Sequence, residues 1–116
     1  MRQVLMVDLR DDPHAIATYR VYHQRVWPEV IDSLRRVGVE QLDIYILGRR
    51  LVMIVEVRGG ADFRSAFEAH AASSPRVAEW ERLMKALQEP SPGAPEDKWW
   101  AAMEPVFKLN GRAAVQ

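Results

Sequence analysis

The sequence predicts an α+β fold of the ferredoxin-like sandwich type, in which helices cover one face of an antiparallel sheet. Two observations lead to this prediction. Segments of strand and helix character follow one another in the order strand, helix, strand, strand, helix, strand. The chain has 116 residues, of which 48% are hydrophobic, and this suits one modest core. We therefore expect one domain over residues 1–110 and a loose C-terminal tail over residues 111–116.

The first strand is predicted by residues 3–9, QVLMVDL, which are rich in strand-forming side chains. A helix is expected directly after it, because Asp12 is a good N-cap and Pro13 suits the first helical position. A strand should therefore lead into a helix across a very short connection.

The first helix is expected to run from His14 to about Val37, with Gly38 as its C-terminal stop. Six apolar residues fall roughly on one face of this segment: Ile16, Tyr19, Val26, Val30, Leu34 and Val37. Pro28 has no N–H for the carbonyl of the preceding turn, so the helix should bend or restart near Trp27. Such a break opens a pocket beside the sheet or is a simple packing kink, and the sequence fits both.

Two strands and two helices are expected next. The runs LDIYIL (42–47) and LVMIVEV (51–57) are separated by GRR, which is short enough for an antiparallel hairpin. Residues 61–72 and 75–87 have helical composition. Between them lies SSP, in which Ser74 can cap and Pro75 can begin the second helix.

The last expected element is a closing strand over residues 103–110, MEPVFKLN, which follows the proline-rich loop 89–98. Its apolar residues Val106, Phe107 and Leu109 suit pairing with a sheet edge. Helices on one side leave the other sheet face uncovered, and small proteins often cover such a face with a second copy. The sequence therefore predicts a homodimer.

The composition excludes several functional classes. Sixteen basic and sixteen acidic residues cancel, and without a local basic patch nucleic-acid binding is not expected. The absence of cysteine excludes disulfides, thiolate zinc sites and a cysteine nucleophile, and fits a reducing compartment. The apolar run at the N-terminus is too short for a signal peptide core or a membrane span. We expect a cytoplasmic protein that binds neither nucleic acid nor a membrane.

The stretch YRVYHQRVWPEV, residues 19–30, contains the first candidate site. Tyr19 and His23 are four residues apart, so both rings leave the same helix face and can meet one ligand. Taken alone, a single helical histidine is more often a packing or surface residue than a catalyst, and Tyr19 would pass as a core residue.

An ordered set of short motifs resembles the L-rhamnose mutarotase family of small sugar anomer-converting enzymes. The set comprises YRVYH, WPE, Gly38, IYIL and VFKLN, and the resemblance extends from about Arg2 to Leu109. It implies a dimeric α+β barrel, no metal or organic cofactor, and catalysis at the anomeric carbon of a 6-deoxy-L-sugar. It also implies that His23 is the proton donor and that Tyr19 contacts the sugar.

Two departures from the family pattern concern the substrate. Leu42 stands where the best-known members have a substrate-contacting tyrosine, and the next aromatic residue is Tyr45. Trp80 and Glu81 stand where those members have a Trp-Trp pair, so a stacking surface remains and a carboxylate is added. Such exchanges alter the hydrogen bonds to individual hydroxyls, by which a site distinguishes epimers. L-fucose and L-rhamnose are therefore both candidate substrates.

Other residues carry weaker expectations. His14 and His70 are each expected at the surface, and three scattered histidines form no recognised metal motif. Trp99 and Trp100 suit a subunit contact, a pocket wall or a core plug, and the subunit contact is favoured because paired aromatics are enriched in interfaces.

Two functions compete with a mutarotase at this level. One is a non-catalytic sugar-binding or regulatory dimer that uses the same side chains without transferring a proton. The other is a dimeric α+β barrel monooxygenase or haem-handling protein, because this fold supports many functions.

Overall fold

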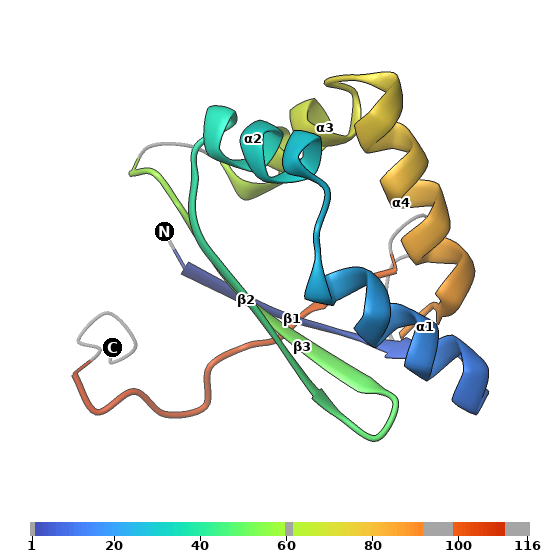
Figure 1. Cartoon of the computed structure of the whole chain (residues 1–116). Helices are drawn as coiled ribbons and strands as arrows, with labels where there is room; N and C mark the ends of the chain where they lie inside the picture. Colours follow the sequence, from blue (N-terminus) through green and yellow to red (C-terminus); the bar gives the residue numbers. More distant parts are fainter. Residues whose placement is uncertain (1, 60–61, 92–98, 111–116) are drawn as a thin grey trace.

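The structure is a computed structural model that describes residues 2–59, 62–91 and 99–110. Figure 1 shows its elements, which are β1 (Arg2–Leu9), α1 (Pro13–Gln24), α2 (Pro28–Arg36), β2 (Val39–Leu47), β3 (Arg50–Val57), α3 (Phe63–Ala71), α4 (Pro75–Leu87), β4 (Gln88–Glu89) and β5 (Ala101–Ala102). The expected C-terminal tail and most of the proline-rich loop lie outside the described residues. No helix in the described ranges is long and apolar enough to span a membrane.

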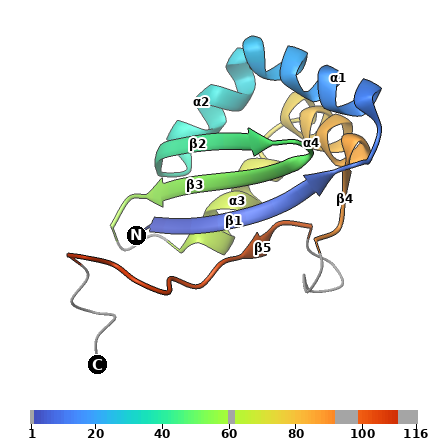
Figure 2. The same ribbon diagram turned by 90° about the horizontal axis from the view of Figure 1, so that it is seen from below.

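The strands form one antiparallel sheet in the order β2-β3-β1-β4, and β5 also pairs with β1 (Figure 2). The expected hairpin between β2 and β3 is confirmed, and Gly48 adopts a positive φ of 63° in its turn. Ile44, Met53 and Leu5 stand side by side across three strands in this register. The α+β sandwich predicted from the element order is confirmed.

The predicted helix starts are confirmed at atomic detail. Asp12 Oδ1 accepts a hydrogen bond of 3.0 Å from the backbone N–H of His14, and Ser74 Oγ caps α4 in the same way. A break separates α1 from α2, and Trp27 is the N-cap residue of the second helix. The restart expected near Trp27 therefore occurs, because Pro28 is accommodated where no intrahelical N–H is needed.

The core lies between the helices and one face of the sheet, as the arrangement in Figure 1 shows. Alternate residues of β1 and β3 point into it, and the most buried are Val7, Leu9, Leu51, Val55 and Val57. All six apolar residues expected on the face of the first helical segment are buried or partly buried. The two-residue period of the strands thus matches the helical stripe, and both bury their apolar sides together.

The expected closing strand over residues 103–110 is wrong. Val106 is 100% exposed, Phe107 77% and Leu109 82%, and none of them pairs with the sheet. The short strands β4 and β5 instead share the edge of β1, and the ladder ends where Met103 donates a hydrogen bond to the oxygen of Val4. Pro105 follows and has no N–H to continue the pairing.

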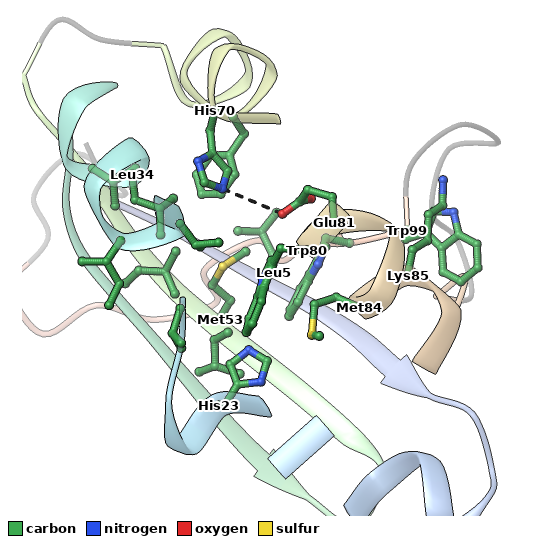
Figure 3. Close-up of a pocket in the computed structure, with 18 of the residues that line it drawn as sticks. Leu5, His23, Leu34, Met53, His70, Trp80, Glu81, Met84, Lys85 and Trp99 are labelled. Carbon is green, nitrogen blue, oxygen red and sulfur yellow. Dashed lines mark ion pairs between the residues drawn. The ribbon is translucent and has the colours of Figure 1, made fainter. Parts of the chain in front are cut away.

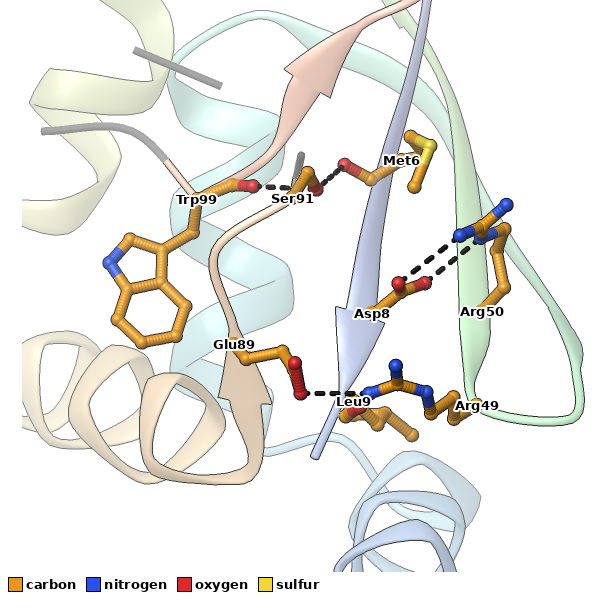
Figure 4. A network of polar contacts seen from close by, with 8 residues as sticks. All are labelled: Met6, Asp8, Leu9, Arg49, Arg50, Glu89, Ser91 and Trp99. Atoms are coloured by element: carbon orange, nitrogen blue, oxygen red, sulfur yellow. Dashed lines mark hydrogen bonds and ion pairs between the residues drawn. The ribbon is translucent and has the colours of Figure 1, made fainter. Parts of the chain in front are cut away.

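Polar contacts fix the edge of the sheet (Figure 4). Arg50 donates two hydrogen bonds to the carboxylate of Asp8, at 2.9 and 3.2 Å, and this lowers the pKa of Asp8. Arg49 donates to Glu89 at 2.7 Å and to the oxygen of Leu9 at 3.1 Å. These contacts hold β4 and the β2–β3 hairpin against the end of β1.

Ser91 anchors the segment that carries the paired tryptophans. Its hydroxyl lies 2.8 Å from the oxygen of Met6 and 3.0 Å from the oxygen of Trp99 (Figure 4). The backbone N–H of Ser91 also donates to the oxygen of Trp99. This anchor sets the position at which Trp99 and Trp100 return to the helix side of the sheet.

Candidate functional site

A cavity of about 700 Å³ lies between the sheet and the helices (Figure 3). Its walls come from the helices α1 to α4, from the strands β1 to β4, and from the segment at residues 99–100. The candidate site residues of the sequence analysis all line it: Tyr19, His23, Leu42, Trp80 and Glu81. A volume of this size is typical of a small-molecule site, and residues far apart in the sequence converge on it.

Tyr19 and His23 meet as their spacing predicts. Their rings stack with centroids 4.1 Å apart and planes inclined by 26°. The Nδ1 atom of His23 is 2.9 Å from the backbone oxygen of Tyr19, and an oxygen of this kind only accepts. Nδ1 therefore carries the hydrogen, and the neutral ring presents Nε2 as a proton acceptor.

Burial shifts the pKa values of both His23 and Tyr19. The pKa of His23 is lowered by desolvation, and the hydrogen bond to the backbone opposes this in part. His23 is therefore neutral near pH 7. The pKa of Tyr19 is raised well above its usual value, mainly by burial and to a smaller extent by the Glu81 carboxylate. The Tyr19 hydroxyl thus stays protonated and can both donate and accept a hydrogen bond.

Trp80 is the centre of an aromatic cluster. Its ring meets the rings of His23, Tyr22 and Trp27 at centroid distances of 5.4, 5.8 and 5.1 Å, all in edge arrangements. The guanidinium of Arg76 lies 3.5 Å above the ring of Trp27. The break between α1 and α2 is thereby packed against α4. Both alternatives for the break therefore hold: it packs against α4, and it also borders a cavity.

Trp80 has little exposed surface for a ligand to contact. It lines the cavity, but only 5% of its surface is exposed. Most of its area supports neighbouring side chains, and the stacking of a sugar on Trp80 stays a prediction.

His70 was expected at the surface, and this is wrong. It is 2% exposed, lines the cavity, and donates a hydrogen bond of 2.8 Å through Nδ1 to Ser33. Its Nε2 atom is 3.8 Å from a carboxylate oxygen of Glu81. The sequence around it, EAHAA, gives no sign of this, because the partners come from α2 and α4. His14, by contrast, is exposed as predicted.

The two residues that depart from the family pattern, Leu42 and Glu81, both line the cavity. Leu42 is half-buried on β2 and contributes an apolar patch to the wall. Tyr45 is 60% exposed and does not line the cavity, so it does not replace the tyrosine that Leu42 lacks. Glu81 brings a carboxylate whose pKa is raised by desolvation.

Trp99 and Trp100 are partly buried against the core and line the cavity. The Nζ atom of Lys85 lies 5.0 Å above the ring of Trp99. Pocket wall and core plug therefore describe their position within one chain, and a subunit contact stays a prediction. Within residues 2–59, 62–91 and 99–110, no group of three or more acidic or histidine side chains is arranged to hold a metal ion.

Comparisons with known proteins identify the family of this chain. The profile of a family described as L-rhamnose mutarotase matches residues 2–109. The chain is 40% identical to an L-fucose mutarotase of Xanthomonas campestris, over 99% of this chain and 93% of that protein. It is 32% identical to an L-rhamnose mutarotase of Burkholderia orbicola, over 79% of this chain and 84% of that protein.

Solved structures support the fold. The crystal structure of an L-rhamnose mutarotase from Formosa agariphila superposes with a TM-score of 0.66 at 21% identity, over 94% of this chain and 98% of that chain. An antibiotic biosynthesis monooxygenase superposes with a TM-score of 0.56 at 19% identity, over 92% of this chain and 100% of that chain. At such identities the likeness establishes the fold alone.

Proposed function

Because the chain belongs to the L-rhamnose mutarotase family, we propose that it interconverts the α and β anomers of a 6-deoxy-L-hexose. The observation that carries this proposal is the position of His23. Its Nδ1 donates to the backbone of its own helix, and no described residue hydrogen-bonds Nε2, which remains available to a substrate in the cavity. The enzyme is an isomerase that needs no redox step.

The reaction requires only proton transfers. The anomeric hydroxyl of the pyranose gives up a proton while the ring oxygen gains one, and the bond between C1 and the ring oxygen breaks. The open-chain aldehyde rotates and closes on its other face. Neutral His23 is suited to take the anomeric proton, because an imidazole with a pKa below its reference of about 6.5 is a base at neutral pH.

The neighbouring side chains are proposed to bind and orient the sugar. The Tyr19 hydroxyl can hydrogen-bond a sugar oxygen, Trp80 offers an aromatic edge, and Leu42 suits an apolar part of the ring such as the 6-methyl group. L-fucose is the first substrate to test, because the relative with 40% identity is an L-fucose mutarotase. L-rhamnose, which differs in configuration at C2 and C4, is the second.

The direct test is NMR saturation-difference exchange between the two anomers, recorded with and without protein. Faster exchange of L-fucose or L-rhamnose is the expected result. No enhancement for either sugar would reject the proposal. Calorimetric binding of a sugar without faster exchange would instead identify a non-catalytic sugar-binding protein.

Leu42 and Glu81 are predicted to set the choice between the two sugars. The double substitution Leu42→Tyr with Glu81→Trp recreates the family pattern. Whatever it does to the absolute rates, it should move the ratio of the two exchange rates toward L-rhamnose by about 10-fold, the scale of one altered hydrogen bond. NMR exchange measured on both sugars checks this, with Tyr45→Phe as a control outside the cavity. A ratio unchanged from that of the parent protein would place the selectivity elsewhere.

We further propose that the protein is a homodimer. Helices cover one face of the sheet, and the segment 103–110 leaves the sheet with Val106, Phe107 and Leu109 almost fully exposed. Three large apolar side chains in so short a segment are unusual on a monomer and suit burial against a second copy.

Light scattering at micromolar concentration is expected to give about twice the chain mass of 13.3 kDa. Replacing Val106, Phe107 and Leu109 together by serine should shift the protein toward monomer. Val21→Ser, which changes an exposed valine on α1, is the matched control and should stay dimeric. A parent protein that is a stable monomer at these concentrations would contradict the dimer.

A further inference from the structure

His70 belongs to a small hydrogen-bond network beneath the cavity wall. Its Nδ1 atom is 2.8 Å from Ser33 Oγ, and Ser33 Oγ is 2.8 Å from Ser73 Oγ. Ser73 Oγ in turn lies 2.7 Å from the backbone oxygen of His70. The network joins α2 to the end of α3 and contains no water-exposed ring nitrogen, since His70 is 2% exposed.

These contacts determine which nitrogen of His70 carries a hydrogen. A backbone oxygen only accepts, so Ser73 uses its single hydroxyl hydrogen on the oxygen of His70. Ser73 must then accept from Ser33, which uses its own hydrogen in doing so. Ser33 can therefore only accept from His70, and Nδ1 is the donor. In the neutral ring, Nε2 is left as a bare acceptor.

The bare nitrogen faces a second acceptor. Nε2 of His70 is 3.8 Å from Oε2 of Glu81, and no other described residue forms an ion pair with Glu81. A lone pair and a carboxylate repel each other at this distance, and a proton on either group removes the repulsion. Half of the Glu81 side chain is exposed, and it lines the cavity. Desolvation raises the pKa of Glu81 and burial lowers the pKa of His70, so both shifts favour the carboxyl group of Glu81 as the holder of a proton bound by this pair.

We propose that Glu81 is the general acid of this site, that it carries the one proton of the His70–Glu81 pair, and that His70 is the positioning residue that directs the carboxyl group into the cavity. The inference rests on the proposed mutarotase function and adds a second catalytic group to it. It also assigns a role to Ser33, which fixes the tautomer of His70.

A proton donor at this wall of the cavity would complement His23. Neutral His23 presents only an acceptor to the cavity and cannot protonate the ring oxygen before it has taken a proton. Figure 3 shows His23 and Glu81 on opposite sides of Trp80, both at the cavity wall. A pyranose lying along Trp80 would thus meet a base at one end and an acid at the other.

The proton balance of one turnover closes without a further reactant. His23 Nε2 takes the proton of the anomeric hydroxyl, C1 becomes a carbonyl carbon, and the bond from C1 to the ring oxygen breaks. Glu81 gives its proton to that oxygen and becomes a carboxylate beside His70. On closure the ring hydroxyl returns its proton to Glu81, and His23 gives its proton back to the new anomeric oxygen. Both groups end in their starting states.

Other charged groups near the pair belong to several elements. The cavity wall also carries four charged side chains, from α2, β2 and α4: Arg35, Glu40, Arg82 and Lys85. None of them forms an ion pair or hydrogen bond with His70 or Glu81 among the described residues. The 3.8 Å contact between His70 and Glu81 is therefore specific to this pair among the described residues.

The test is the pH profile of anomer exchange in the full-length protein. The exchange rate of the parent protein should have a bell-shaped pH dependence. Its acidic limb comes from protonation of His23 and its alkaline limb from loss of the proton on Glu81. Glu81→Gln keeps a hydrogen-bonding amide of the same shape but holds no transferable proton. It should lower kcat on the order of 10²-fold or more, change KM far less, and remove the alkaline limb while the acidic limb remains.

The positioning role has its own variant. His70→Phe keeps the ring volume and should lower kcat about 10- to 100-fold, as for a misplaced catalytic group. It should also move the alkaline limb and leave the acidic limb in place, which a purely structural defect would not do. Glu79→Gln, on the same helix but bonded to Arg76, and His14→Phe, at an exposed histidine, are the matched controls and should behave like the parent.

Two outcomes overturn the inference while leaving the proposed function intact. One is a parent enzyme active on a sugar whose Glu81→Gln variant retains both its rate and its alkaline limb. The other is an ¹⁵N NMR spectrum of the parent protein in which His70 is protonated on Nε2 and bare on Nδ1, a result that requires no variant to fold. A parent enzyme without any exchange activity would instead remove the proposed function itself.

Discussion

His23→Ala is expected to lose anomer exchange by roughly 10²–10⁴-fold, the usual contribution of one general acid–base group. His23 is the histidine of α1 that lines the cavity, and the hydrogen bond from Nδ1 to the oxygen of Tyr19 leaves Nε2 as its free acceptor. Alanine removes this acceptor entirely. NMR exchange on the better substrate, at pH 7 and saturating sugar, measures the loss.

Tyr19→Phe is the comparison for this experiment. It keeps the buried ring that stacks on His23 and removes only the hydroxyl. The expected effect is about one hydrogen bond, roughly 0.5–1.5 kcal/mol, and it should appear in KM as well as in kcat. Circular dichroism and light scattering must show that both variants keep the parent fold and assembly. A folded His23→Ala protein with full exchange activity would end the proposed role of His23, whatever Tyr19→Phe does.

The acidic side of the pH profile should report His23 directly. Because burial lowers its pKa, His23 stays neutral down to a pH below the reference value of about 6.5. Activity should therefore hold as the pH falls through that value and decline only at lower pH, as the imidazole becomes protonated and stops accepting. A decline that begins well above pH 6.5, measured where the protein is fully folded, would contradict the assignment.

Trp80→Ala is expected to cause the largest loss of stability, about 3–5 kcal/mol. Trp80 is 5% exposed and contacts the rings of His23, Tyr22 and Trp27, so its removal leaves a cavity at the junction of α1, α2 and α4. A loss of this size is a large fraction of the 5–15 kcal/mol typical of a folded domain. Urea unfolding at one fixed protein concentration measures it, since a dimer would make the midpoint concentration-dependent.

Trp80→Phe is the matched control for the stability experiment. It retains one aromatic ring at the centre of the cluster and should cost clearly less than alanine. If Trp80→Ala unfolds at nearly the parent urea concentration, the aromatic cluster does not hold the helices together. Activity is a poor readout for this pair, because Trp80 also lines the cavity.

Local sequence signals predicted the elements of the fold well. Asp12 and Ser74 each cap a helix as expected, and Pro13, Pro28 and Pro75 each begin one. These signals act within a few residues, through φ restriction and a side chain that satisfies a backbone N–H. The β2–β3 hairpin was equally predictable, because its two apolar runs are separated by a short turn with Gly48 at a positive φ.

The closing strand shows where composition alone fails. Residues 103–110 have the apolar content of a strand, yet the edge of β1 is already shared by β4 and β5, and Pro105 cannot continue the ladder. Pairing depends on which edge is free, and that is a property of the assembled sheet.

The amino-acid sequence was enough to predict the order of elements as far as α4, the break before Pro28 and the contact of Tyr19 with His23, because each depends on spacing along one segment. The tertiary structure alone decided the environment of His70. Its partners Ser33 and Glu81 are 37 and 11 residues away in the chain, on α2 and α4, and only the packing of the helices brings them to one ring. Burial then shifts the pKa values of His70 and Glu81 in opposite directions, which no local pattern of residues encodes.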